Sequence, residues 1–234
     1  MHIATSSAPT IATHFSIRLD DVRLVRGATT VFDGLSLALS EPRIGLIGDN
    51  GAGKSSLFRL MCGLDQPQVG HVVLPDGPRS VGMMFQNPDE QIIFPTVEEE
   101  LALSLHHLQL SRKEAQEKVR GWLEARGLAH WANRAVGSLS QGQRQHVCWL
   151  ALLIAGHQTL LLDEPFSSLD LPSQALLRRD IANAKEQIMV STHVLSHVRH
   201  FERVVWLDQG QVRADGPGEE VCAAYEADVA LRCA

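Results

Sequence analysis

The sequence predicts an α/β protein with a mainly parallel sheet, an N-terminal antiparallel β subdomain and an inserted helical subdomain. Three patterns support this fold class. In the second half of the chain, continuously apolar runs alternate with helical segments, as in parallel sheets covered on both faces. The first strands alternate apolar and polar residues, which is typical of antiparallel sheets. Between residues 87 and 156 the composition is helical.

The opening segments predict antiparallel strands followed by a strand, a loop and a helix. Gly27 and Gly34 supply turns, and Gly63 can cap the first helix. The helical region contains Ser or Thr followed three residues later by Glu or Gln, a pattern that satisfies free amides at a helix start. The expected elements are strands 16–25, 31–39 and 43–47, a helix over 56–62, helix starts at Thr96, Ser111 and Ser140, and a buried helix over 143–155.

The last part of the chain predicts a βαβ unit and a hairpin. The apolar strands 159–162 and 187–191 are separated by a helix over 173–184. A hairpin of 204–207 and 211–214 then leads to Pro217, which suits the first position of a helix.

Composition excludes several classes of protein. The chain has 234 residues, a formal charge of −6 and no run of Lys or Arg, which argues against a nucleic-acid partner. The four cysteines show no metal-like spacing and suggest a reducing compartment. The most apolar region, residues 147–162, is too interrupted for a membrane helix. Residues 1–14 lack the apolar run of a signal peptide and are expected to be a flexible tail.

The segment Gly48-x-x-x-x-Gly53-Lys54-Ser55 has the pattern of a P-loop, and it lies between an apolar strand and a helix. The glycines let backbone N–H groups face a phosphate, while the helix N-terminus adds partial positive charge. Lys54 is expected to reach the outer phosphates and the Ser55 hydroxyl to hold Mg²⁺. The residues expected to bind ATP in this loop are Gly48, Asn50, Gly51, Ala52, Gly53, Lys54, Ser55 and Ser56.

The apolar strand 159–162 delivers Asp163 and Glu164 to its carboxyl end, where ligands bind in open parallel sheets. Asp163 is expected to act on the Mg²⁺ shell. Glu164 points the other way along the pleat and is expected to orient or deprotonate an attacking water.

Further motifs give the chain a family resemblance. Leu139-Ser-Gln-Gly-Gln143 resembles the signature motif of ATP-binding-cassette (ABC) ATPases, with Gln141 where glycine is more usual. Gln86 is similar to the Q-loop glutamine, which implies a place in the Mg²⁺ shell and in catalysis. Ser168-Leu-Asp170 resembles the D-loop, and His193 the switch histidine at the γ-phosphate. The resemblance implies a P-loop NTPase domain over residues 15–234, with a core at about 15–86 and 157–234 and a helical subdomain at about 87–156.

The resemblance also implies a head-to-tail dimer. ATP bound by one chain would be covered by the partner's Ser140, Gly142, Gln143 and Asp170. Ser140 fits an N-cap, so the helix after it would aim free amides at the γ-phosphate. Because Glu164 and His193 occur in the same chain as an intact signature, a homodimer is expected.

Two features depart from the family pattern or complicate it. Arg26 stands where the family has an aromatic platform for adenine, and its planar guanidinium can stack on the base; a solvated strand-end arginine is the alternative. His193, His197 and His200 recur with helical spacing, which admits a metal site. No interleaved acid completes a zinc motif, so His197 and His200 are predicted to lie on a helix surface.

The segment 85–100 resembles the Q-loop region of energy-coupling-factor importers, whose ATPases grip a membrane T-component. Its apolar triplet Ile92-Ile-Phe94 either docks that component or packs into the helical lobe. With the short stretch after the predicted hairpin, the segment looks most like the ATPase of bacterial biotin importers. That resemblance implies a peripheral protein at the cytoplasmic face of the bacterial inner membrane, with T- and S-component partners and no nucleic acid.

Other functions stay open at this point. A cobalt, nickel or other vitamin importer would use the same kind of ATPase, because specificity resides in another subunit. A soluble ABC ATPase without transport predicts duplicated cassettes or basic insertions, and neither is visible. A P-loop small-molecule kinase would leave Ser140 and Gln143 of the signature unexplained.

Overall fold

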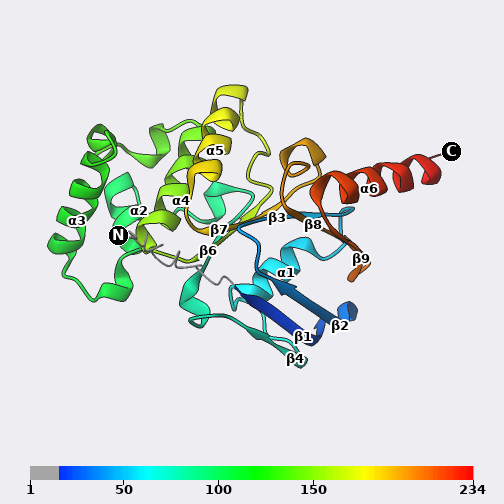
Figure 1. Ribbon diagram of the computed structural model, residues 1–234. Coiled ribbons are helices and arrows are strands. Elements are labelled where there is room, and N and C mark those ends of the chain that lie inside the picture. The colour runs from blue at the N-terminus through cyan, green and yellow to red at the C-terminus, as the bar shows by residue number, and fades with distance from the viewer. Residues whose placement is uncertain (1–15, 234) are drawn as a thin grey trace, which may run out of the picture.

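The computed structural model describes residues 16–233, so the tail expected at 1–14 lies outside the described residues. Figure 1 shows two sheets, with helices α2 to α4 gathered at one end of the molecule and α6 at the other. The strands are β1 (Ile17–Arg26), β2 (Thr29–Leu39), β3 (Arg43–Ile47), β4 (Val69–Val73), β5 (Val81–Met84), β6 (Thr159–Asp163), β7 (Gln187–Ser191), β8 (Arg203–Asp208) and β9 (Gln211–Gly216). The α-helices are α1 (Lys54–Met61), α2 (Val97–Leu103), α3 (Arg112–Glu124), α4 (Gln141–Ala155), α5 (Leu171–Asn183) and α6 (Gly218–Arg232).

The strands form an antiparallel sheet in the order β2-β1-β4 and a larger sheet in the order β5-β6-β7-β3-β8-β9. All neighbouring pairs in the larger sheet are parallel except β8 and β9. The predicted α/β fold class is therefore confirmed. In this order β3 lies beside β7 and β8, so the loop after β3 opens at the carboxyl edge of the sheet.

Two strands that the sequence does not signal are β4 and β5. β4 is mostly exposed and lies at the edge of its sheet, so it lacks a clear pattern of burial. β5 is four residues long and contains Gly82. A Cβ at Gly82 would lie 2.3 Å from the His157 ring, so this glycine serves packing against the segment after α4.

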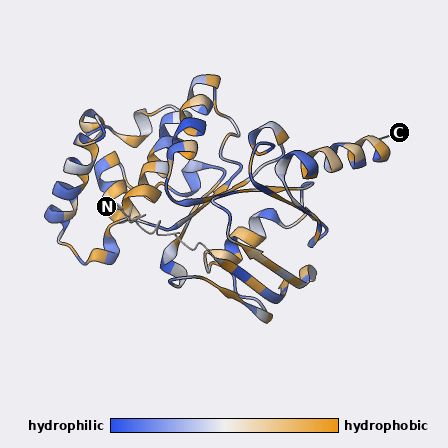
Figure 2. Ribbon diagram, viewed as in Figure 1, coloured by the Kyte–Doolittle hydropathy of each residue, from blue (hydrophilic) through white to orange (hydrophobic). Residues whose placement is uncertain are grey.

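The interior consists of two apolar clusters on opposite faces of the larger sheet. One packs that sheet against helices that include α4, through residues such as Trp149 and Leu162. The other packs it against α1 and the antiparallel sheet, through residues such as Phe58 and Phe32. Figure 2 shows hydrophobic residues along the central strands and mixed turns on α3 and α6. No helix within residues 16–233 is long and apolar enough to cross a membrane.

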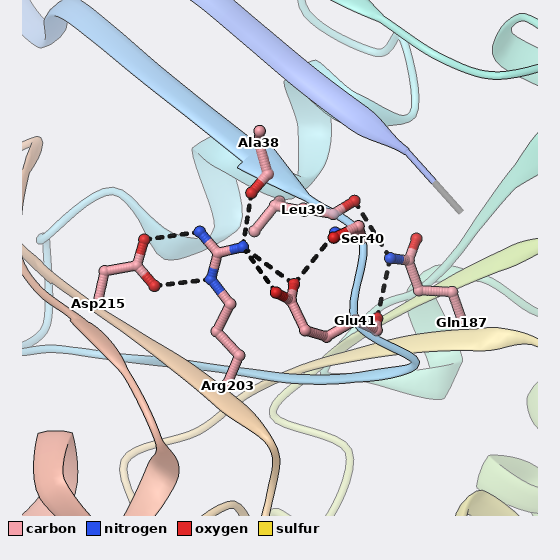
Figure 3. A network of polar contacts seen from close by, with 7 residues as sticks. All are labelled: Ala38, Leu39, Ser40, Glu41, Gln187, Arg203 and Asp215. Carbon is pink, nitrogen blue, oxygen red and sulfur yellow. Dashed lines mark hydrogen bonds and ion pairs between the residues drawn. The ribbon is translucent and has the colours of Figure 1, made fainter. Parts of the chain in front are cut away.

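A polar network around Arg203 joins the two sheets (Figure 3). Arg203 on β8 donates to both carboxylate oxygens of Asp215 on β9, each at 2.7 Å. It also donates to the Ala38 carbonyl of β2 at 2.7 Å and to Glu41 Oε2 at 2.9 Å. Gln187 of β7 donates to the Glu41 carbonyl at 3.0 Å. The end of β2 and Glu41 just after it are thus fixed to β7 and β8, and Arg203 links them to β9.

The three histidines with helical spacing do not share a helix. Residues 195–197 form a short 3₁₀ turn, and no α-helix covers His193 to His200 in the described chain. His197 is buried, whereas His193 and His200 are exposed. The prediction that His197 and His200 lie on a helix surface is therefore wrong for both. His200 is exposed but lies outside every helix of the described chain, and His197 is buried because tertiary packing against Phe166 overrides the spacing.

Candidate nucleotide-binding site

A cavity of about 740 Å³ opens at the carboxyl ends of the parallel strands. Its walls come from β1, β2, the loop between β3 and α1, the ends of β5 and β6, the segment after β7, and α6. The lining residues are Arg26, Thr29, Val31, Gly48, Asp49, Asn50, Gly51, Gly53, Lys54, Ser55, Ser56, Gln86, Asp163, Glu164, His193 and Tyr225.

The glycine loop has a backbone that only glycine adopts without strain. Gly48 has φ +145°, and a Cβ there would lie 2.1 Å from the Leu207 carbonyl oxygen. Gly53 has φ +107°, and its Cβ would meet the Phe32 ring at 2.8 Å. Gly53 is also the N-cap of α1 and makes no side-chain cap, and the first turn of α1 carries no acidic residue. The amides at the start of α1 therefore face the cavity without a competing carboxylate, as an anion-binding helix start requires.

Lys54 folds back over this loop. Its Nζ donates to the carbonyl of Gly48 at 2.7 Å and to that of Asp49 at 3.0 Å. The residue is only 8% exposed, and burial lowers the pKa of its ammonium group, while the nearby carboxylates of Glu164 and Asp163 act in the opposite direction. An ammonium group has three N–H donors, so one remains for a ligand in the cavity.

The two acidic residues after β6 have different surroundings. Asp163 Oδ1 accepts a hydrogen bond from the Ser191 hydroxyl of β7 at 2.5 Å. Glu164 has φ +46° and donates its backbone N–H to the Ser191 carbonyl at 3.1 Å. Its Oε2 lies 2.9 Å from Nδ1 of His193. A non-glycine residue in the left-handed region is a conformation often found at functional sites, and here it aims Glu164 at His193.

The cavity offers oxygen donors of the kind that Mg²⁺ prefers. The Ser55 hydroxyl, the Gln86 amide and the Asp163 carboxylate all line it, and Asp163 keeps Oδ2 free of the Ser191 contact. This donor set fits Mg²⁺, a hard cation that takes oxygen ligands and retains several waters.

Several expected site residues lie elsewhere. Within the described chain, Ala52 does not line the cavity. It is buried and donates its N–H to the Asp49 carbonyl at 3.2 Å. The four residues expected to act from a partner chain also do not line the cavity of the described chain. They are Ser140, Gly142, Gln143 and Asp170.

Those four residues cap and pack helices within their own chain. Ser140 is the N-cap of α4, and it exchanges hydrogen bonds with Gln143 at 3.1 and 3.2 Å. Asp170 is the N-cap of α5 and accepts from the Ser173 amide at 2.9 Å. A Cβ at Gly142 would lie 2.3 Å from Ser173 Oγ, so this glycine also allows α4 to approach α5.

Arg26 lines the cavity from the end of β1, and its guanidinium pairs with Asp65, which Arg59 of α1 also contacts at 3.1 Å. Thr29 and Val31 of β2 line the cavity as well. Arg26 is therefore tethered beside the cavity, and its assignment as the adenine platform stays a prediction.

Tyr225 and Asp49 are site residues that the sequence motifs do not identify. Tyr225 lies on α6, and its hydroxyl donates to Asp49 Oδ1 at 2.5 Å across 176 residues of sequence. Asp49 occupies a variable position of the P-loop pattern, so the pattern assigns it no role. No local signal in the sequence announces a contact of this range.

Comparisons with known proteins agree with this geometry. A profile described as ABC transporter matches residues 32–167. The chain is 42% identical over 219 residues to the biotin transport ATP-binding protein BioM of Rhodobacter capsulatus, covering 90% of this chain and 94% of that protein. It is 36% identical over 197 residues to the energy-coupling factor transporter ATP-binding protein EcfA of Methanothermobacter thermautotrophicus, covering 76% of this chain and 63% of that protein.

The fold also has a counterpart among solved structures. It is similar to cbiO1 from Clostridium perfringens, described as part of the ABC transporter complex cbiONQ, with a TM-score of 0.77 and 23% identity. The match covers 92% of this chain and 93% of that chain. At this level of identity the likeness shows the fold alone.

Proposed function

The chain belongs to the ABC transporter family of ATP-binding proteins, and from this membership we propose that it is the ATP-hydrolysing subunit of an energy-coupling-factor importer for biotin. One observation carries the ATPase: the glycine loop, Lys54, Asp163 and Glu164 meet in a single cavity. The importer type and the solute are supported by relatives that are named for energy coupling and for biotin transport. A cobalt, nickel or other vitamin importer is the alternative.

In the proposed reaction the chain's own groups bind the phosphates and prepare a water molecule. The loop amides and Lys54 hold the phosphates, while Ser55, Gln86 and Asp163 would hold Mg²⁺. When bound, Mg²⁺ neutralises charge on the transferred phosphoryl group. Glu164 accepts a hydrogen bond from the attacking water and orients it. His193 holds the Glu164 carboxylate through Nδ1, which leaves its other ring nitrogen for the γ-phosphate.

The proposed active unit is a homodimer. Ser140 and Asp170 are exposed, and the start of α4 carries a capping box and no acidic residue in its first turn. The free amides and dipole of such a helix favour a negative ligand. A second copy can bring this helix start to the γ-phosphate, which explains why the cavity of one chain lacks the signature residues.

The proposed membrane contact lies on the face that carries a second groove, whose lining residues in the described chain differ from those of the nucleotide cavity. A groove of about 680 Å³ runs between β5 and the end of α4, with Leu64, Met83, Phe85 and Leu152 among its lining residues. Ile93 comes two residues after Gln91, which lines this groove, and is 70% exposed. Exposed apolar surface often marks protein interfaces. We assign this face to a membrane T-component that works with a substrate-binding S-component, which places the ATPase at the cytoplasmic face of the cell membrane.

The ATPase is tested with two variants that separate binding from hydrolysis. Lys54→Ala should reduce Mg-ATP binding by at least about tenfold and abolish hydrolysis, because the buried ammonium is lost. Glu164→Gln should keep ATP binding but lose hydrolysis by about a hundredfold or more, since it removes the group that orients the water. Binding is measured by calorimetry and turnover by phosphate release.

Four results would contradict the proposal. Undiminished ATP binding by Lys54→Ala would remove the P-loop from the site. Phosphate transfer to a metabolite would favour a kinase. If a T-component and a biotin-binding subunit reconstituted with the chain did not stimulate hydrolysis, the importer function would be rejected. Stimulated hydrolysis without biotin uptake into the vesicles would reject biotin as the solute.

A further inference from the structure

The Asp49 carboxylate, at the start of the P-loop, is held entirely from α6. The Tyr225 hydroxyl donates to Oδ1 at 2.5 Å, and Arg232 Nη1 donates to Oδ2 at 2.6 Å. Each oxygen of Asp49 therefore has its own donor, and both donors come from one helix. Figure 1 shows α6 beginning beside β8 and projecting outward to the C-terminus, at the opposite end of the molecule from α2 to α4.

The backbone of Asp49 is also part of the loop's own hydrogen bonding. Its carbonyl accepts from Lys54 Nζ at 3.0 Å and from the Ala52 amide at 3.2 Å. The same residue thus connects α6, through its side chain, to the phosphate-binding lysine, through its carbonyl. A displacement of the Asp49 side chain would therefore shift the carbonyl that holds Lys54 Nζ.

The contact between Arg232 and Asp49 also has an electrostatic effect on the cavity. Asp49 lines the cavity that receives the nucleotide, and a carboxylate there repels a polyphosphate. Arg232 supplies the opposite charge directly on Oδ2, and its hydrogen bond holds the pKa of Asp49 below the usual value, so the carboxylate is ionised at neutral pH. The Asp49 and Arg232 side chains are 46% and 48% exposed, so salt will screen part of the effect.

Other contacts fix α6 in this position. The Tyr225 ring packs edge-on against Trp206 of β8, with ring centroids 5.2 Å apart. Asp228 accepts from Arg232 at 2.8 Å and from Arg213 of β9 at 3.0 Å. The helix is therefore anchored to the edge of the sheet, and its two donors are presented to the loop from a fixed support.

We propose that Tyr225 and Arg232 are positioning residues of the nucleotide site: they compensate the Asp49 charge and hold the loop, so that affinity for ATP, and its preference over ADP, depends on α6. The inference rests on the proposed ATPase. Its ligand is a nucleoside triphosphate, whose extra negative charge relative to the diphosphate makes it the more sensitive to an uncompensated carboxylate.

The test measures the Mg-ATP and Mg-ADP affinities of the parent protein and five variants at low and high salt. Arg232→Gln should weaken ATP binding about two- to fivefold, the size expected for a half-exposed ion pair, and ADP binding less. KM should rise with kcat little changed, and the loss should shrink at about 1 M salt, where charges are strongly screened. Asp49→Asn in the Arg232→Gln background should restore ATP affinity, because the repelling charge is gone.

Two further variants complete the test. Tyr225→Phe keeps the ring and removes the hydroxyl, so it should weaken binding by about twofold. Glu226→Gln is the matched control: it removes an ion pair of the same helix, with Arg199, that does not touch the loop, and binding should not change. If Arg232→Gln fails to fold, the single variant Asp49→Asn tests the proposal. Charge compensation predicts that its ATP affinity equals or exceeds that of the parent protein, and a lower affinity would contradict the proposal.

The proposal is overturned if the double variant binds ATP as weakly as Arg232→Gln, or if ATP and ADP weaken equally at every salt concentration. Either result would reduce the α6 contact to a structural support. Failure of the parent protein to bind ATP at all would instead reject the proposed function, so the two failures are distinguishable.

Discussion

His197 shows how burial gives a single residue properties that its sequence context hides. Its ring packs at a tilt against that of Phe166, with centroids 4.2 Å apart, and Arg178 Nη2 lies 3.4 Å from its Nε2. Nδ1 is buried and has no hydrogen-bond partner among the described residues. Burial lowers the pKa of His197 to about 4, with the nearby charge of Arg178 acting in the same direction. The ring is therefore neutral in the folded protein at neutral pH.

Stability should consequently fall in mild acid. Between about pH 6.5 and pH 4 the unfolded chain binds a proton at His197 and the folded chain does not, so the free energy of unfolding decreases as pH falls through this window. The full effect is up to roughly 3 kcal/mol, and it is absent above about pH 6.5. Urea unfolding at several pH values measures it. His197→Gln does not titrate, so its stability should depend less on pH there; parallel curves would show that other groups cause the acid loss.

The segment between Gln86 and α2 shows how a buried acid shapes an element. Glu100 is only 5% exposed, and its Oε2 accepts the backbone N–H groups of Ile93 at 3.0 Å and Phe94 at 2.9 Å. These contacts fix the backbone and leave the Ile93 side chain in solvent. Of the two alternatives left open for the apolar triplet, exposure of Ile93 favours docking over packing into the helical lobe. Ile92 packs against the core instead.

Replacing Ile93 and Phe94 together with Ser should abolish co-purification with the membrane component. Unfolding stability should change little, because the side chains lost are partly or largely exposed. Leu231→Ser is a suitable control, since Leu231 is also exposed, at 80%, but lies on α6, away from this face. Co-purification is measured after co-expression with the T-component. A complex retained by the double variant would rule out this segment as the docking element.

At the scale of the whole molecule, the cavity contains one half of the expected site. It gathers the P-loop, the two acids after β6 and His193, whereas Ser140 and its neighbours cap α4 outside it. In the proposed homodimer, the signature residues of one chain reach the nucleotide that the other chain binds. The position of the cavity thus supports the proposed homodimer, which the bound nucleotide would hold together.

Light scattering of Glu164→Gln with Mg-ATP should accordingly give twice the monomer mass, because ATP stays trapped between two copies. The double variant Lys54→Ala with Glu164→Gln should stay monomeric, since it cannot hold the nucleotide. If the trapped variant remained monomeric even with its membrane partners present, the homodimer would be rejected.

The sequence by itself determined the chemistry that depends on neighbouring residues. The strand before Gly48, the glycine spacing and the apolar run before Asp163 are local patterns, and each fixes a local structure. The fold class followed from the same patterns and is confirmed. The family resemblance, built on short motifs in a fixed order, is confirmed by the family match.

Tertiary structure alone decided the contacts that span large separations. Tyr225 and Arg232 reach Asp49 across 176 and 183 residues, and His197 is buried by a phenylalanine from another segment. The edge strands β4 and β5 gain their order from neighbours rather than from a pattern of their own. Local sequence fixes backbone preference and hydrogen-bonding chemistry. Which distant surfaces meet depends on the topology of the sheet, and this topology places α6 beside the P-loop.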